Sequence, residues 1–161
     1  MKRIILAALL LCLAVPVHAA DLGDVVSVWG GVNGAWFDGP DTAFPADLEV
    51  GGNAAASLSP HLSAVGAVYY GFDHSYVRWS AGGRVTVTDV DNKDFSVGLG
   101  LQYRGASEAE LQPNEWAYDA SFGVKPFAAK WPKLSVVGQG WYGIESQRAG
   151  AILGLRYMLP I

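Results

Sequence analysis

The stretch from Phe95 to Arg104 alternates at every step between an apolar side chain and a small or polar one. Because successive side chains of a β-strand point to opposite faces, this pattern predicts a strand with one apolar face and one face of Gly, Ser, Gln and Arg. The pattern returns about eight times along the chain, and no run with helical periodicity competes with it. The chain is therefore constrained to an all-β fold whose strands are each apolar on one face.

Breaks rich in Gly, Pro, Asp and Asn separate the alternating segments. To within ~2–4 residues, the strands are expected at 25–37, 46–58, 61–72, 77–88, 94–104, 115–126, 133–144 and 148–159. These lengths suit strands of ~9–11 residues that cross a bilayer at a tilt. We therefore expect an all-β, eight-stranded antiparallel up-and-down transmembrane β-barrel with both termini on the periplasmic side. The connections 38–46, 73–76, 105–114 and 145–147 would then lie on the outer side.

The N-terminus resembles a cleaved export signal. Lys2 and Arg3 form a basic start, an apolar run covers 4–15, and small residues end the segment at Ala19 and Ala20. The apolar run is too short to span a bilayer comfortably. We expect a signal peptide over residues 1–20 and a single barrel domain over residues 21–161.

Composition agrees with a membrane-embedded sheet. The chain is 51% hydrophobic and 16% charged, against the ~25% charge typical of soluble domains. The part after the signal peptide nevertheless contains no apolar run of the ~18 residues that a transmembrane helix needs. The net charge of −4 argues against a nucleic-acid partner. We find no sequence repeat longer than the strand period.

The polar faces carry charges that should point into the barrel, because Arg or Lys on the lipid face near the bilayer midplane costs ~2–4 kcal/mol. The expected lumen charge network comprises Glu49, Arg78, Arg84, Arg104, Glu115, Asp119, Lys125, Arg148 and Arg156. Arg104 and Glu115 flank one connection and are expected to pair near the outer rim. Arg84 and Asp119 are expected to meet across the narrow lumen.

Aromatic side chains gather near the strand ends. One ring is expected from Trp36, Phe37, Tyr70, Phe72, Tyr76, Trp79, Tyr103, Trp116, Tyr118, Trp141 and Tyr142. The opposite ends carry Phe95, Phe127, Trp131 and Tyr157. Two such girdles with aliphatic residues between them are typical of a bilayer-spanning barrel. A soluble lipocalin-type barrel would need an outer face rich in Lys, Glu and Thr, whereas the polar face here is mostly Gly, Ala and Ser.

The strand pattern resembles the small eight-stranded outer-membrane proteins, the OmpA transmembrane-domain and OmpX-like group. At the C-terminus, Gly154, Tyr157 and Leu159 are similar to the assembly signal of that group, although the chain ends in Pro160 and Ile161 rather than in an aromatic residue. The resemblance implies outer-membrane lipid and lipopolysaccharide as surroundings and the barrel-insertion machinery as a partner during assembly. It is one of architecture rather than of a specific motif.

Catalysis was weighed because a lipid A deacylase and a palmitoyltransferase of the outer membrane use small barrels. His61 and Ser63 follow Ser59-Pro60 in what reads as a turn. Asp73-His74-Ser75 contains triad residue types, but adjacent side chains of an extended loop point apart. The segment 89–94 contains Asp and Asn yet lacks the glycine and closing glutamate of a calcium loop. We expect no catalytic, metal or cofactor site.

The expected function is therefore a structural or envelope role in a Gram-negative-type outer membrane, without catalysis, for a monomer whose lumen is largely filled by side chains. Two alternatives stay open. One is a narrow, porin-like channel for ions or very small solutes, and the other is a lipid-modifying enzyme.

Overall fold

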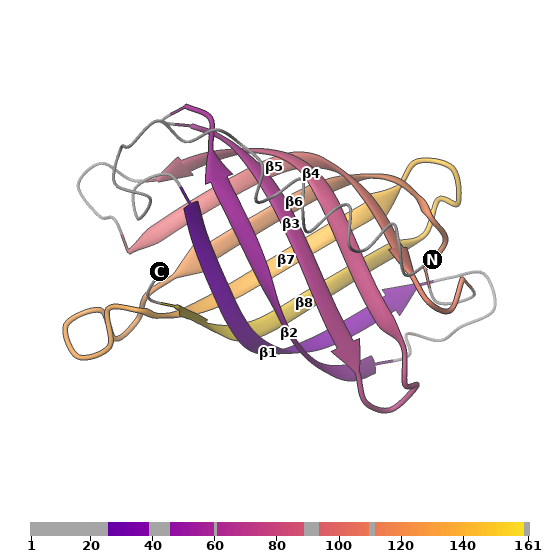
Figure 1. Ribbon diagram of the computed structural model, residues 1–161, viewed down its shortest axis with the longest axis horizontal. Helices are drawn as coiled ribbons and strands as arrows, with labels where there is room; N and C mark the ends of the chain where they lie inside the picture. Colours follow the sequence, from indigo (N-terminus) through magenta and orange to yellow (C-terminus); the bar gives the residue numbers. More distant parts are fainter. Residues whose placement is uncertain (1–25, 39–45, 60, 89–93, 110–111, 160–161) are drawn as a thin grey trace.

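The computed structural model is a closed barrel of antiparallel strands in which each strand pairs with its neighbour in the chain and β1 closes on β8 (Figure 1). It describes residues 26–38, 46–59, 61–88, 94–109 and 112–159. The strands are β1 (Val26–Asp38), β2 (Ala46–Ser57), β3 (Leu62–Gly71), β4 (Val77–Thr88), β5 (Phe95–Ala106), β6 (Glu115–Val124), β7 (Leu134–Gly143) and β8 (Ala149–Met158). Each lies within two residues of its expected bounds. The expected signal peptide lies outside the described residues. Among those residues, no helix has the length and apolarity needed to span a bilayer.

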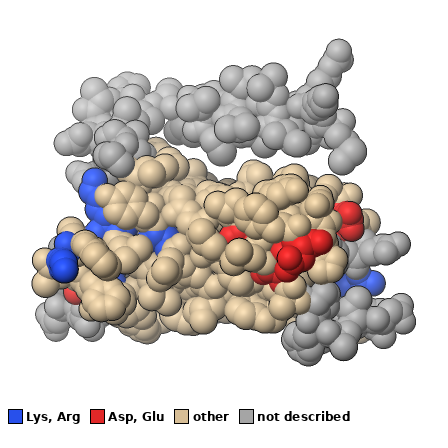
Figure 2. All heavy atoms as spheres, turned by 90° about the horizontal axis from the view of Figure 1, so that it is seen from below, with Lys and Arg blue, Asp and Glu red and all other residues tan. Residues whose placement is uncertain are grey.

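The barrel is apolar outside and polar inside. Leu99, Tyr118 and Leu155 expose 65%, 62% and 55% of their surface on the outer wall. By contrast, Arg78 and Arg104 are fully buried. On the face seen in Figure 2, most of the wall is uncharged, with basic side chains gathered mainly toward one end and acidic side chains toward the other. This arrangement fits a wall that contacts lipid and does not fit one that contacts water.

The aromatic rings are confirmed on the outer wall for most of their expected members, including Trp116 and Tyr118 at one end and Phe127 and Trp131 at the other. Three expected members of the first ring lie elsewhere. These are Phe37, Tyr76 and Trp141, which are 3%, 0% and 7% exposed. Their side chains point into the barrel because the alternation of inward and outward side chains along each strand continues to the strand ends.

A small apolar core closes the lumen at the end where β1 finishes and β2 begins. The Phe37 ring contacts the rings of Tyr76 and Trp141 edge-on, with centroids 5.8 Å apart in both pairs. Ala35, Ala106, Ala117 and Ile152 complete the cluster. The cluster fills this end of the lumen, next to the β3–β4 turn and the β7–β8 turn.

The hairpins β3–β4 and β7–β8 repeat one another. Ser63 pairs with Arg84 in the first hairpin, and Ser135 pairs with Arg156 in the second, so the strands have the same register. The aligned stretches 62–84 and 134–156 share the same residue at the pairs Leu62/Leu134, Ser63/Ser135, Val65/Val137, Gly66/Gly138, Tyr70/Tyr142, Gly71/Gly143, Gly82/Gly154 and Arg84/Arg156.

The turns of these hairpins also have the same conformation. Ser75 and Gln147 stand at equivalent positions, and both have positive φ angles, 53° and 57°. The amide of Gly71 donates to the carbonyl of Tyr76 at 2.9 Å, and the equivalent bond from Gly143 to Arg148 is 2.8 Å. The barrel therefore contains an internal repeat, which a search based on the strand period alone misses.

Candidate functional site

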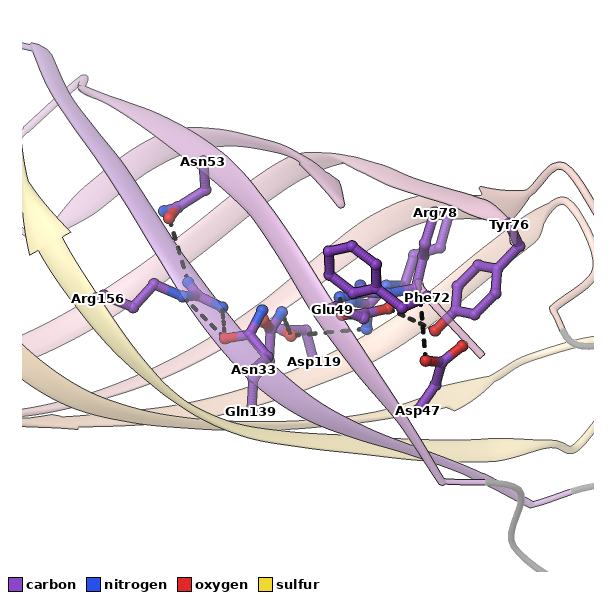
Figure 3. Close-up of polar contacts among 11 residues, drawn as sticks. Asn33, Asp47, Glu49, Asn53, Phe72, Tyr76, Arg78, Asp119, Gln139 and Arg156 are labelled. Carbon is purple, nitrogen blue, oxygen red and sulfur yellow. Dashed lines mark hydrogen bonds and ion pairs between the residues drawn. The ribbon is translucent and has the colours of Figure 1, made fainter. Parts of the chain in front are cut away.

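The lumen contains a buried ion pair near its apolar end. Arg78 donates to both carboxylate oxygens of Glu49, from Nε at 2.8 Å and from Nη2 at 2.7 Å (Figure 3). The hydroxyl of Tyr76 donates to the same carboxylate at 2.8 Å. Burial, and after it the nearby Glu49 carboxylate, raise the pKa of Tyr76, so its hydroxyl stays protonated. The carboxylate is thus fully engaged by its neighbours.

Asp119 is the centre of a second polar group in the middle of the barrel. Its Oδ1 accepts hydrogen bonds from Nε and Nη2 of Arg84, at 2.9 and 2.7 Å. The side-chain amide of Gln102 donates to the same oxygen at 3.1 Å, and Gln139 donates to Oδ2. Arg104 lies farther away, with Nη1 at 4.0 Å from Oδ2. One carboxylate therefore serves two guanidinium groups.

Three guanidinium groups stack on two aromatic rings inside the lumen. The ring of Tyr69 lies 4.8 Å from the guanidinium carbon of Arg78 and 5.1 Å from that of Arg156. The ring of Trp141 lies 5.2 Å from that of Arg78 and 4.0 Å from that of Arg104. Cations over aromatic faces attract the ring quadrupole, more strongly when both are dry. We call these five side chains the cation–π ladder.

Of the three arginines in the ladder, Arg104 and Arg156 have no carboxylate within hydrogen-bond distance among the described residues. The three guanidinium nitrogens of Arg104 are buried without a hydrogen-bond partner among the described residues. Arg156 donates to amide oxygens, at 3.3 Å from Nε and from Nη2 to Asn33 and at 3.2 Å from Nη1 to Asn53 (Figure 3). An amide oxygen satisfies the donors but leaves the charge uncompensated.

Two acids at strand starts cap the turns of the repeated hairpins. Asp47 accepts the backbone amides of Phe72, Asp73 and His74 at 3.1, 2.9 and 3.3 Å. Carboxylates that accept several backbone N–H groups hold such a turn in one conformation.

Glu115 makes the equivalent contacts with the β7–β8 turn. It accepts the amides of Glu145 and Ser146, each at 2.9 Å, and the hydroxyl of Ser146. Glu115 was expected in the lumen network, and it is indeed buried. Its partners, however, are turn amides.

The expected pairing of Arg84 with Asp119 is confirmed, and the expected pairing of Arg104 with Glu115 is wrong. Arg104 and Glu115 are direct register partners, but Glu115 bends toward the β7–β8 turn while Arg104 stacks on Trp141. The backbone amides offer Glu115 a closer set of donors. Register alone could not distinguish these two outcomes.

Lys125 and Arg148 lie just beyond the ends of their strands. Lys125 follows the last residue of β6, where its amide donates to the carbonyl of Asp94 at 2.8 Å. Arg148 precedes β8 within the turn, where its amide donates to the hydroxyl of Ser146 at 3.1 Å. Both residues were expected within the strands, because the alternation of apolar and polar residues continues past the true strand ends.

The two histidines considered as catalytic residues, His61 and His74, lie beyond opposite ends of β3. His61 is exposed at a bend before β3, and its carbonyl accepts the amide of Thr86 at 2.7 Å. Nδ1 of His74 lies 3.4 Å from Oδ2 of Asp47, so the acid near this imidazole comes from β2 and not from the adjacent Asp73. Within the described chain, His, Cys, Asp and Glu side chains form no group of three suited to a metal ion.

Sequence reasoning missed the uncharged members of the lumen. Asn33, Gln102 and Gln139 are hydrogen-bonded to charged side chains, and Tyr69 and Trp141 provide the ladder rings. A signal was present, since Tyr69 and Trp141 fall on the nominally polar side of their strands. Aromatic residues among inward charges could have been interpreted as cation–π partners.

Comparison with known proteins supports the fold. The structure is similar to a de novo designed transmembrane β-barrel, with a TM-score of 0.54 and 15% identity over 83% of this chain and 95% of that one. The Ail attachment invasion locus protein of Yersinia pestis aligns with a TM-score of 0.48 and 12% identity, over 83% of this chain and 97% of that one. No protein-family model matches the chain, and neither does any curated protein. The chain thus has the architecture of a transmembrane β-barrel.

Proposed function

We propose that this chain is an outer-membrane β-barrel with a structural role in a Gram-negative-type cell envelope. In this proposal, side chains pack the lumen, support the wall and block the passage of solutes. The observation that supports this most directly is the buried cation–π ladder with its two carboxylate groups. Barrels of eight strands have interiors just wide enough to be filled by side chains. Such a lumen stiffens the wall and leaves no room for diffusion of solutes.

The proposal includes export by a cleaved N-terminal signal, insertion by the barrel-assembly machinery, and life as a monomer among outer-membrane lipids and lipopolysaccharide. The apolar outer wall, with aromatic residues near both ends, supports a lipid environment. The face seen in Figure 2 is mostly uncharged, as expected of a surface in contact with lipid.

Cell fractionation and gel mobility test the location. The mature protein should be recovered with the outer membrane, and its mobility in a denaturing gel should change on boiling, because a folded barrel resists detergent at room temperature. Recovery in the soluble periplasm with the same mobility before and after boiling would contradict the proposal.

A narrow anion-conducting channel is the second candidate, because the middle of the lumen has more guanidinium groups than carboxylates and contains a small cavity. The cavity measures about 10 Å³, and Arg84 and Arg156 line it. Planar-bilayer recordings separate the two functions. A structural barrel should show little or no steady current, whereas steady anion-selective current in the wild type would favour the channel.

The lack of catalysis is also a proposal. His74 and Asp47 resemble the base and orienting acid of a hydrolase, but a nucleophile must lie within hydrogen-bond reach of the imidazole. Ser75 follows His74 with its backbone at positive φ in the turn. Mass spectrometry of outer-membrane lipids with and without the protein should give identical profiles, and a new or missing acyl chain would instead favour the enzyme.

A further inference from the structure

The small cavity in the middle of the lumen lies between two arginines of the repeated hairpins. Arg84 from β4 and Arg156 from β8 both line it. Uncharged polar side chains complete much of its wall, among them Asn53, Ser80 and Gln139. The centre of a water-sized sphere can move through about 10 Å³ of this cavity, which is room for one small occupant.

The two arginines are unequally neutralised. Arg84 donates two hydrogen bonds to Asp119. Tyr69 and Trp141 occupy equivalent positions in the two repeated hairpins. The register partner of Trp141 on the preceding strand is Asp119, and the register partner of Tyr69 on its preceding strand is Gly51. Gly51 therefore occupies the position that corresponds to Asp119. Arg156 has no carboxylate from this position and donates to amide oxygens instead.

The glycine is also required by packing. A Cβ atom at Gly51 would lie 2.7 Å from Cδ1 of Tyr69, and it would collide with the carbonyl oxygen of Val68. The backbone of β3, together with the ring of Tyr69, therefore leaves no room for a residue with a carboxylate at this position. The same ring contacts the guanidinium of Arg156.

We propose that this cavity is a binding site for one small monovalent anion, such as a halide, between Arg84 and Arg156. Two guanidinium groups that face one small cavity repel each other where water is scarce, and Asp119 compensates the charge of Arg84 but not that of Arg156. A halide ion reverses this repulsion and accepts hydrogen bonds from guanidinium N–H groups and from the hydroxyl of Ser80. Organic anions such as gluconate are too large for this cavity.

Bromide gives a direct test, because its anomalous scattering locates it without a change to the protein. Crystals of the wild-type barrel grown in bromide should show an anomalous peak between Arg84 and Arg156. Bromide peaks confined to the outer surface and to the loops would overturn the proposal.

Stability in matched salts gives a second test on the folded wild-type barrel in detergent micelles. Above the dissociation constant, the unfolding equilibrium constant should fall about tenfold for each tenfold rise in chloride. Sodium gluconate at the same ionic strength should have no such effect, because gluconate is too large for the cavity. Equal effects of chloride and gluconate would overturn the proposal.

Asn53→Asp tests the charge argument with an almost unchanged shape. The new carboxylate would pair with Nη1 of Arg156, which already lies 3.2 Å from Oδ1 of Asn53, and would act as the missing counter-ion. The chloride dependence should disappear, and the stability in gluconate should rise. The matched control is Asn114→Asp, an exposed position just before β6, which should keep the chloride response. Retention of the full response in Asn53→Asp would contradict the site.

Discussion

Arg84 and Arg156 occupy equivalent positions of two hairpins with the same register, yet Arg84 binds the carboxylate of Asp119 and Arg156 binds the amide oxygens of Asn33 and Asn53. The backbone of the barrel is therefore more symmetric than its lumen. The asymmetry concentrates positive charge in the middle of the barrel and makes Asp119 the main counter-ion there.

Replacement of Asp119 with Asn should destabilise the barrel strongly. It would leave the guanidinium of Arg84 without its ion pair and remove the nearest carboxylate from Arg104. Breaking a buried pair from one side typically costs about 3–5 kcal/mol. Denaturant titration of the folded barrel in micelles measures the change in the free energy of unfolding.

Glu108→Gln is the control for this variant, because Glu108 is an exposed acid beyond the end of β5. Surface substitutions of this kind usually change stability by less than about 0.5 kcal/mol. The same two proteins should be compared in planar bilayers, where Asp119→Asn should raise anion leakage if it loosens the lumen. Equal stability of the two variants would mean that Asp119 is not the central counter-ion.

Alanine at Gly71 or Gly143 should lower the stability of the barrel by about 1–3 kcal/mol, the usual cost of overpacking. A Cβ atom at Gly71 would lie 2.7 Å from Oδ2 of Asp47 and would collide with the ring of Tyr76. At Gly143 the same atom would collide with the carboxylate of Glu115. Gly83 is the matched control, since a Cβ atom there meets nothing within 4 Å. If Gly83→Ala costs as much as Gly71→Ala, the loss comes from strand flexibility and not from the capping acids.

Asp47→Ala should loosen the β3–β4 turn without unfolding the barrel. The amides of Phe72, Asp73 and His74 would lose their shared acceptor, at a cost of about 1–3 kcal/mol for the set. Hydrogen exchange should accelerate at these amides and stay slow in the β7–β8 turn, which Glu115 caps. Unchanged protection at His74 would show that the turn conformation is maintained by the backbone alone.

The orientation in the membrane can be tested with single cysteines at Ser107 and Lys130. Ser107 follows β5 at one end of the barrel, and Lys130 lies in the β6–β7 turn at the other end. With both termini in the periplasm, a membrane-impermeant thiol reagent should label the cysteine at 107 on intact cells. The cysteine at 130 should react only after the outer membrane is permeabilised, and the reverse pattern would mean that the barrel is inserted the other way round.

The strand pattern could be predicted from the sequence because alternation and turn residues are local signals. They also predicted which face of the charge-bearing strands is inward, and hence the pairing of Arg84 with Asp119. Strand ends were less clear, since Lys125 and Arg148 continue the alternation past the last paired residues. The same continuation hid the inward positions of Phe37 and Tyr76.

Contacts inside the lumen depend on geometry that no local pattern contains. The sequence cannot show that Glu115 reaches turn amides while Arg104 stacks on Trp141, because both outcomes leave the register unchanged. The internal repeat was visible in principle. It becomes evident only when 62–84 is aligned with 134–156, a spacing that a search for the strand period does not sample.

Replacement of Arg104 with Met should leave the barrel as stable as the wild type or make it more stable, by up to about 1–4 kcal/mol. Arg104 is fully buried, its guanidinium nitrogens have no hydrogen-bond partner in the described chain, and its nearest carboxylate oxygen is 4.0 Å away. Methionine has a similar length and keeps a favourable contact with the ring of Trp141 through its sulfur. Asp119 would still be bound by Arg84.

Arg78→Met is the contrasting variant, because it would leave the buried carboxylate of Glu49 without its two guanidinium hydrogen bonds. Its expected cost is about 3–5 kcal/mol, as for other buried pairs broken from one side. Denaturant titrations of both variants in the same micelles give the comparison. Equal and large losses of stability would mean that Arg104 has a strong counter-ion in the folded barrel, so that ion pairs hold the ladder at Arg104 as well as at Arg78.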